Sequence, residues 1–207
     1  MYQFANTRKV YYNSKMNPEI EEKKDLNWRN SAREWAKTII IALLIALPIR
    51  FFIAEPFIVN GASMDPTFDS GNFLIIDRLS YRFQEPQRDD VIVFKYPFNQ
   101  KVYYIKRIIG LPNETVKIQD GKITIINEEN KDGFVLDESF ISESRLSHDT
   151  STIQLGSEQY FVMGDNRIQS SDSRAWGLLD QNLIVGRPIL RLFPFSNISL
   201  WPGQINL

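Results

Sequence analysis

Two residue types that enzymes often use for catalysis are almost missing from this chain. It has 207 residues with no cysteine and one histidine, His148, which lies in the polar run Ser147-His148-Asp149-Thr150. The absence of cysteine excludes disulfides, thiolate metal sites and thiol nucleophiles, and one histidine does not supply the several ligands of a typical zinc site. We therefore expect no metal or other cofactor and a dispensable His148. For a nucleophilic enzyme, a serine activated by a lysine is the best remaining option.

The chain also lacks an excess of charge of either sign. Lys and Arg number 24 and Asp and Glu number 25, which gives a net charge of −1. Without a global basic field, nucleic acid is not an expected partner. The length allows one domain of good size with appendages.

One apolar segment stands out, residues 38–54, with the sequence TIIIALLIALPIRFFIA. As a helix it reaches roughly 26 Å, close to the thickness of a bilayer's hydrocarbon core. Basic residues precede it, at positions 23, 24, 29, 33 and 37, and a basic flank favours the cytoplasmic side. The pattern predicts a retained single-pass transmembrane anchor, a cytoplasmic tail over residues 1–37, and an exported domain over residues 55–207.

Two other interpretations of this segment are open. A buried globular helix is possible, although residues 39–47 show no polar stripe. A cleaved signal peptide would have an unusually long n-region and no small-x-small site, and cleavage after Ala62 would leave Ser63 as the new N-terminus.

The exported part reads as mainly antiparallel β structure. Asp120-Gly121 is a strong two-residue hairpin signal, whereas residues 127–157 are polar and irregular and look like an insertion on the rim of the sheet. Short β-branched and aromatic runs separated by turn residues predict strands over 57–59, 73–77, 90–96, 102–109, 115–118, 122–126, 159–163 and 183–187.

Ser63 and Lys106 are the candidate nucleophile and base. A charged lysine is a poor base, and lowering its pKa to roughly 8 requires about 3 kcal/mol of burial penalty on the ammonium. In a strand, Lys106 shares a face with Tyr104 and Ile108 while Arg107 points to the opposite face. We expect Lys106 to enter an apolar pocket and Arg107 to stay outside it.

A third element begins with Gly164-Asp165-Asn166-Arg167 and continues with the hydroxyl-rich run from Ser170 to Gly177. It predicts a tightly hydrogen-bonded turn that holds Lys106 by a hydroxyl and braces the site through an Asp172–Arg174 pair.

With these elements in order, the chain resembles the bacterial type I signal peptidases, serine proteases with a Ser/Lys dyad. The resemblance runs from about Trp35 to Trp201 and includes the anchor. It rests on the serine box Gly61-Ala62-Ser63-Met64-Asp65-Pro66-Thr67, the strand box Asp89-Asp90-Val91-Ile92-Val93-Phe94, the lysine box from Tyr104 to Pro112, and the Gly164-to-Gly177 box.

The resemblance implies a role for each residue. It makes Ser63 the nucleophile and Lys106 the general base, while Ser170 orients the lysine and Asp172 and Arg174 support the site. Two positions depart from the family pattern. Gly61 stands where the family often has a serine that helps to line the oxyanion hole, so the hole would rest on the Ser63 backbone N–H. Asp89 stands where glycine is common, which we interpret as a turn variation.

The implied enzyme is a signal-peptide endopeptidase of the bacterial cytoplasmic membrane. Its partners are the lipid bilayer and preproteins, which bind as an added β-strand and are cut after small-x-small sites. Two other functions compete. A self-cleaving Ser/Lys regulator would need a DNA-binding helix-turn-helix, and a non-catalytic membrane-tethered β-domain would not need both Ser63 and Lys106.

Overall fold

The computed structural model describes residues 18–48, 54–147 and 149–205. Residues 1–17 of the predicted tail, residues 49–53 of the predicted anchor, His148 and residues 206–207 therefore lie outside the described residues. The chain divides into two compact units, Met1–Leu47 and Pro48–Leu207, and each is considered separately.

The first unit contains the helix α1 (Pro18–Pro48). It begins twenty residues before the predicted anchor, at a proline, whose fixed φ suits the first position of a helix. Apolar side chains between Ile39 and Leu47 are exposed, with Leu44 68% exposed. No helix among the described residues combines the length and hydropathy needed to cross a membrane.

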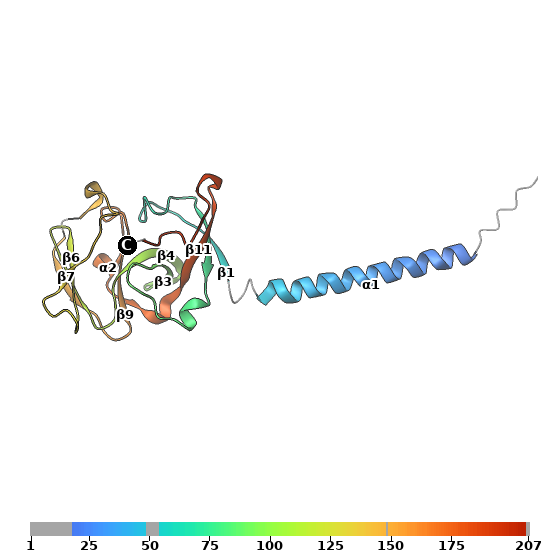
Figure 1. The fold of residues 1–207 in the computed structure, drawn as a ribbon, viewed down its shortest axis with the longest axis horizontal. Helices are drawn as coiled ribbons and strands as arrows, with labels where there is room; N and C mark the ends of the chain where they lie inside the picture. The colour runs from blue at the N-terminus through green and yellow to red at the C-terminus, as the bar shows by residue number, and fades with distance from the viewer. Residues whose placement is uncertain (1–17, 49–53, 148, 206–207) are drawn as a thin grey trace, which may run out of the picture. The chain divides into compact units, whose positions relative to one another are not determined.

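The second unit is built on two antiparallel sheets (Figure 1). In the described residues, the larger sheet has eight strands in the order β1-β2-β11-β3-β4-β9-β10, with β12 paired to β11. The smaller sheet has the order β7-β6-β5-β8. The larger sheet comprises β1 (Ala54–Ile58), β2 (Phe73–Asp77), β3 (Val91–Tyr96), β4 (Asn99–Gly110), β9 (Gln159–Met163), β10 (Leu179–Asp180), β11 (Ile184–Phe193) and β12 (Ser199–Leu200). The smaller comprises β5 (Thr115–Gln119), β6 (Lys122–Ile126), β7 (Phe134–Val135) and β8 (Ser151–Gln154).

Short helical turns connect these strands. The α-helical turn α2 (Ser173–Trp176) lies between β9 and β10. The 3₁₀ turns are η2 (Ser80–Arg82), η3 (Glu143–Arg145), η4 (Gln181–Leu183) and η5 (Phe195–Asn197).

The prediction of a mainly antiparallel β fold is confirmed. The strands predicted over 73–77, 122–126 and 159–163 have the observed bounds, while β4 and β11 extend beyond the predicted ones. Asp120 and Gly121 form the turn between β5 and β6 with φ values of 51° and 79°, the left-handed conformation that a two-residue hairpin favours. Strands β7, β8, β10 and β12 were not predicted because two to four residues are too few to show alternation.

Residues 127–157 are more than an insertion on the rim. They supply both edge strands of the smaller sheet, β7 and β8. Leu155 is buried in the core between the sheets, and Leu136 and Ile153 pack against that core. Because this stretch is mostly polar, its local sequence pattern did not predict these few apolar contacts.

The core fixes the segment that carries the predicted nucleophile. Met64 and Phe68, which follow Ser63, are buried in a cluster with Leu74 and Ile76 of β2. Burial of such side chains stabilises their positions by roughly 1.5–3 kcal/mol each. The loop between β1 and β2 is therefore anchored directly after Ser63.

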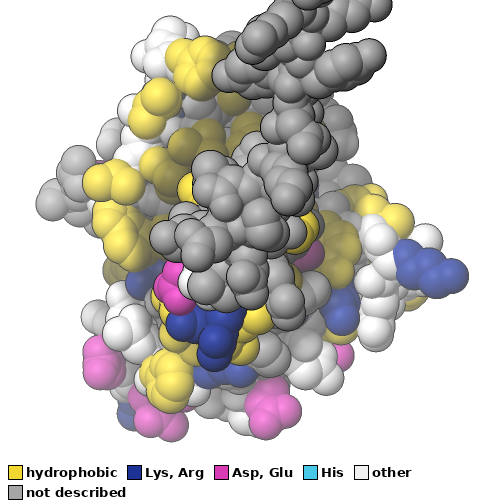
Figure 2. All heavy atoms as spheres, turned by 90° about the vertical axis from the view of Figure 1, so that its right-hand side faces the viewer, with side chains coloured by type: hydrophobic (Ala, Val, Ile, Leu, Met, Phe, Trp, Pro, Cys, Tyr) yellow, Lys and Arg dark blue, Asp and Glu magenta, His cyan; other side chains and the backbone are white. Residues whose placement is uncertain are grey.

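Apolar side chains also remain exposed near the C-terminal strands. Phe195 is 77% exposed, Leu200 73% and Ile198 55%. Figure 2, which looks onto the side of the domain that carries β1 and β11, shows exposed hydrophobic side chains beside basic ones.

Candidate active site

Ser63 lies in a turn just after β1. The Asp65 N–H donates to the Ala62 carbonyl at 3.3 Å, and the Phe68 N–H donates to the Met64 carbonyl at 2.9 Å. Before the serine, Gly61 has a φ of +96°, which L side chains rarely adopt. A glycine there lets the chain turn sharply from the strand into the loop.

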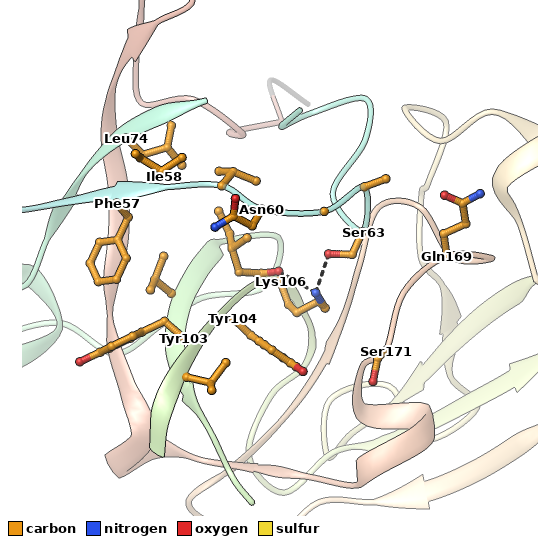
Figure 3. Close-up of a pocket in the computed structure, with 16 residues that line it drawn as sticks. Phe57, Ile58, Asn60, Ser63, Leu74, Tyr103, Tyr104, Lys106, Gln169 and Ser171 are labelled. Carbon is orange, nitrogen blue, oxygen red and sulfur yellow. Dashed lines mark hydrogen bonds between the residues drawn. The ribbon is translucent and has the colours of Figure 1, made fainter. Parts of the chain in front are cut away.

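Lys106 lies in the middle of β4, and the fold brings its amine to Ser63. The Lys106 Nζ donates to the Ser63 Oγ at 2.7 Å and to the Ile105 carbonyl at 3.0 Å (Figure 3). The Tyr104 ring lies 5.3 Å from the same nitrogen. This is hydrogen-bonding distance for a nucleophile and its base.

Burial changes the acidity of this lysine. The Lys106 side chain is 4% exposed, and burial lowers the pKa of Lys106 to about 8 although Asp172 and Asp165 oppose the shift. Its neutral fraction at pH 7 is then about one tenth, against well under one thousandth for an ordinary lysine. The amine can therefore accept a proton near neutral pH.

Arg107 lies outside the groove that Lys106 lines, as expected, but it is buried and not exposed to solvent. Arg107 is 1% exposed, and its guanidinium forms a bidentate pair with Asp165 at 2.8 and 2.6 Å. Both faces of this part of β4 are covered, so a buried cation here requires a partner. The Thr67 hydroxyl also donates to Asp165 at 2.5 Å, which links the loop after Ser63 to the strand that carries Lys106. The sequence alone did not identify Asp165 as the partner of Arg107. The available signal was its position directly after a predicted strand and Gly164.

The Asp172–Arg174 pair is present and organises its loop. Arg174 donates to Asp172 from Nε and Nη2, each at 2.8 Å. Asp172 also caps α2 and accepts from the Gly164 N–H at 3.1 Å. Burial acts to raise the pKa of Asp172, but hydrogen bonds and the Arg174 charge outweigh it and lower this pKa. The carboxylate is thus held ionised at the centre of the loop.

Ser170 and Gly164 pack closely against the nucleophile's backbone. A Cβ on Gly164 would lie 2.3 Å from both the Ser63 carbonyl oxygen and the Ser170 Oγ. The Ser170 hydroxyl lies beside Asp172 and contributes to lowering its pKa, yet its Oγ is buried without a hydrogen bond of good geometry among the described residues. The expected hydrogen bond from Ser170 to Lys106 is not formed in this structure.

Asp89, the second departure from the family pattern, has a φ of 66°. This is the left-handed conformation that glycine adopts freely and that aspartate tolerates better than most residues. Its carbonyl accepts from Arg107 Nη1 at 2.8 Å. The turn accounts for an aspartate in place of glycine at this position.

The Ser63–Lys106 pair opens into a groove of about 440 Å³ between the β1 end and β4. In Figure 3, Phe57 and Tyr103 lie at one end, and Gln169 and Ser171 lie at the other. The groove thus offers apolar surface on one side of Ser63 and polar side chains on the other. In the described part of the chain, no group of three or more His, Cys, Asp or Glu side chains is placed to hold a metal ion.

Comparison with known proteins gives a consistent match. Residues 32–193 match the family model described as signal peptidase, peptidase S26. The chain is 37% identical over 189 residues to "Signal peptidase I" of Bacillus licheniformis, an alignment that covers 86% of this chain and 98% of that protein. It is 38% identical over 165 residues to "Probable signal peptidase I-1" of Synechocystis sp., covering 76% and 81% of the two chains. A crystal structure of a signal peptidase I from Enterococcus faecalis matches with a TM-score of 0.41 and 30% identity, covering 50% of this chain and 97% of that one.

Proposed function

The chain belongs to the signal peptidase family, peptidase S26, and from this we propose that it is a serine endopeptidase that removes N-terminal signal peptides from preproteins. The observation that carries the mechanism is the 2.7 Å hydrogen bond between the Lys106 Nζ and the Ser63 Oγ.

In the proposed reaction, neutral Lys106 takes the hydroxyl proton of Ser63 as the Oγ attacks the scissile carbonyl carbon. The Ser63 N–H stabilises the oxyanion of the tetrahedral intermediate. The lysine ammonium then gives its proton to the leaving amine, and the signal peptide remains bound to Ser63 as an ester. Lys106 next takes a proton from a water molecule that attacks this ester. The ammonium returns that proton to the Ser63 Oγ as the ester bond breaks, which restores the serine and releases the signal peptide with a free carboxyl group.

Ser170, Asp172 and Arg174 are proposed to support this dyad. The Asp172–Arg174 pair holds the loop whose Gly164 lies against the Ser63 backbone. Ser170 lies in the same loop. A rotation of its side chain would let the hydroxyl form a hydrogen bond with Lys106 and orient the amine. These residues position the dyad and do not react.

The groove favours an extended substrate. Among the described residues, β1 pairs only with β2 and is an edge strand of its sheet, so a peptide can add to it by main-chain hydrogen bonds. Alternate side chains of that peptide would then point into the apolar end of the groove, beside Phe57 and Val93. Small residues at the first and third positions before the cut fit this arrangement.

Residues 38–54 are proposed to anchor the enzyme in the bacterial cytoplasmic membrane, with the N-terminus in the cytoplasm and the catalytic domain outside. The exposed apolar side chains of residues 39–47 support the anchoring, and the basic residues before the segment support this orientation. Protease added to intact spheroplasts is expected to digest the domain after Ala54 and to spare the N-terminal region. Protection of the domain would reject this topology.

The competing functions gain no support. The described N-terminal region, residues 18–48, is one continuous helix, whereas a DNA-binding regulator needs a helix-turn-helix. A non-catalytic domain would not need the buried Lys106 amine at hydrogen-bonding distance from Ser63.

The deciding experiment compares wild type with Lys106→Arg and Ser63→Ala, as full chains in detergent micelles, on a signal-peptide substrate with an Ala-x-Ala site. Lys106→Arg should lose activity although it keeps the charge, because guanidinium does not release its proton in this range. The double variant should lose little more than either single one, because the dyad acts as a unit. Substantial cleavage by Lys106→Arg would reject Lys106 as the base.

A further inference from the structure

Building on the proposed function, we propose that residues 137–147, here called the strap, hold the nucleophile in place, and that Arg145 is a positioning residue for Ser63 through its ion pair with Asp65. The Arg145 Nη2 lies 2.6 Å from the Asp65 Oδ2. Asp65 is two residues after Ser63, in the turn closed by its own N–H and the Ala62 carbonyl.

The strap runs from the smaller sheet toward the catalytic residues of the larger one. Its Ile141 side chain is buried. Its Glu138 pairs with Arg167, and both side chains are nearly inaccessible, at 9% and 2% exposed. Its Phe140 ring lies 4.8 Å from the Arg107 guanidinium. Three successive contacts fix the strap before it reaches Arg145.

Each arginine that the strap touches neighbours a part of the site. Arg107 directly follows Lys106 in β4. The Arg167 Nε donates to the Gly164 carbonyl at 2.9 Å. Arg174, the partner of Asp172, donates from Nη1 to the Ser147 Oγ at 2.6 Å. The strap is therefore tied to the lysine strand and to the supporting loop, and Arg145 adds a tie to the serine turn.

The turn that contains Ser63 is packed unevenly, which explains why a further restraint is useful there. After Ser63, buried Met64 and Phe68 anchor the chain. Before it, Gly61 is exposed with φ +96°, and apart from its own residue and its two chain neighbours no described atom lies within 4 Å of where its Cβ would be. The Asn166 N–H also holds the Ser63 carbonyl at 3.1 Å, so the turn is held from Ser63 onward and is open at Gly61. The Asp65–Arg145 pair adds a side-chain restraint two residues after the nucleophile.

Because both residues of the pair are partly exposed, its effect on the position of Ser63 can be distinguished from its effect on global stability. Asp65 and Arg145 are each 30% exposed, and a pair at this exposure contributes little to global stability. The geometry at Ser63 is more sensitive, because small displacements of a reacting group reduce rates strongly. Loss of the pair should therefore lower kcat while it leaves the stability of the protein nearly unchanged.

The test measures kcat, KM and the thermal midpoint of full-length variants in detergent micelles. Arg145→Ala is expected to lower kcat by roughly tenfold, with KM and the midpoint close to wild type. The reversed pair, Asp65→Arg with Arg145→Asp, should recover most of the lost kcat, and Arg145→Lys should retain more of it than Arg145→Ala. The matched control is Arg78→Ala, which removes an arginine of similar exposure, 38%, from its pair with Glu55, and it should leave kcat unchanged.

Three outcomes would overturn the inference: a kcat for Arg145→Ala equal to that of Arg78→Ala, a raised KM with unchanged kcat, or equal losses in Arg145→Ala, Arg145→Lys and the reversed pair. Wild type and Arg78→Ala report separately on the proposed function. If neither cleaves a signal-peptide substrate, the proposed function fails; if both cleave it, a negative result concerns the strap alone.

Discussion

Replacing Lys106 with methionine should abolish activity and make the protein more stable at neutral pH. Methionine is an unbranched chain that can follow the same path through the apolar surroundings. In the wild type, burial lowers the pKa of Lys106 from 10.5 to about 8. At about 1.4 kcal/mol per pKa unit, holding the ammonium in the folded state costs about 3 kcal/mol below pH 8.

The substitution also removes two hydrogen bonds, to the Ser63 Oγ and the Ile105 carbonyl, which contribute roughly 1 kcal/mol each. A net gain of roughly 1 kcal/mol at pH 7 follows, and a domain of this size should then melt about 2–4 °C higher.

The pH dependence gives the sharper test. Between pH 8 and 10.5 the folded wild type has lost this proton and the unfolded chain has kept it, so the unfolded state binds more protons and wild-type stability rises with pH. The advantage of Lys106→Met is therefore largest below pH 8 and disappears toward pH 10.5, where the lost hydrogen bonds leave the variant less stable.

Chemical denaturation of wild type and Lys106→Met at pH 7 and pH 10, in the same detergent, would measure this reversal. A stability difference between the two proteins that does not change with pH would refute the reasoning that burial of the ammonium sets the lysine's acidity.

Three other substitutions test single features of the site. Gly61→Ser should lower both activity and the melting temperature, although the family often has a serine at this position, because φ +96° predicts strain of about 1–2 kcal/mol; Gly61→Ala should cause equal losses if the backbone is the cause. Gly164→Ala should reduce both folding yield and kcat, because the new Cβ would meet the Ser63 carbonyl and the Ser170 Oγ at 2.3 Å; wild-type kinetics would show that the loop can move away. His148→Ala should cleave a signal-peptide substrate at the wild-type rate, and loss of activity in a folded protein would revive a Ser/His mechanism.

Local sequence determined much of this protein. Short β-branched and aromatic runs bounded by turn residues placed most strands of the larger sheet, because such runs depend on near neighbours. The left-handed pair Asp120-Gly121 placed the hairpin for the same reason. The missing cysteines and the single histidine reduced the chemistry to a serine and a lysine before any contact was known.

The tertiary structure decided what depends on distant parts of the chain. Ser63 and Lys106 are 43 residues apart in sequence, and only strand pairing and loop packing set their 2.7 Å distance. Arg107 became buried because another segment supplied Asp165, which no strand periodicity could reveal. Residues 127–157 joined the core through a few scattered apolar contacts and short edge strands. Burial is a property of the whole fold, so the sequence could name the lysine, but only the fold could lower its pKa.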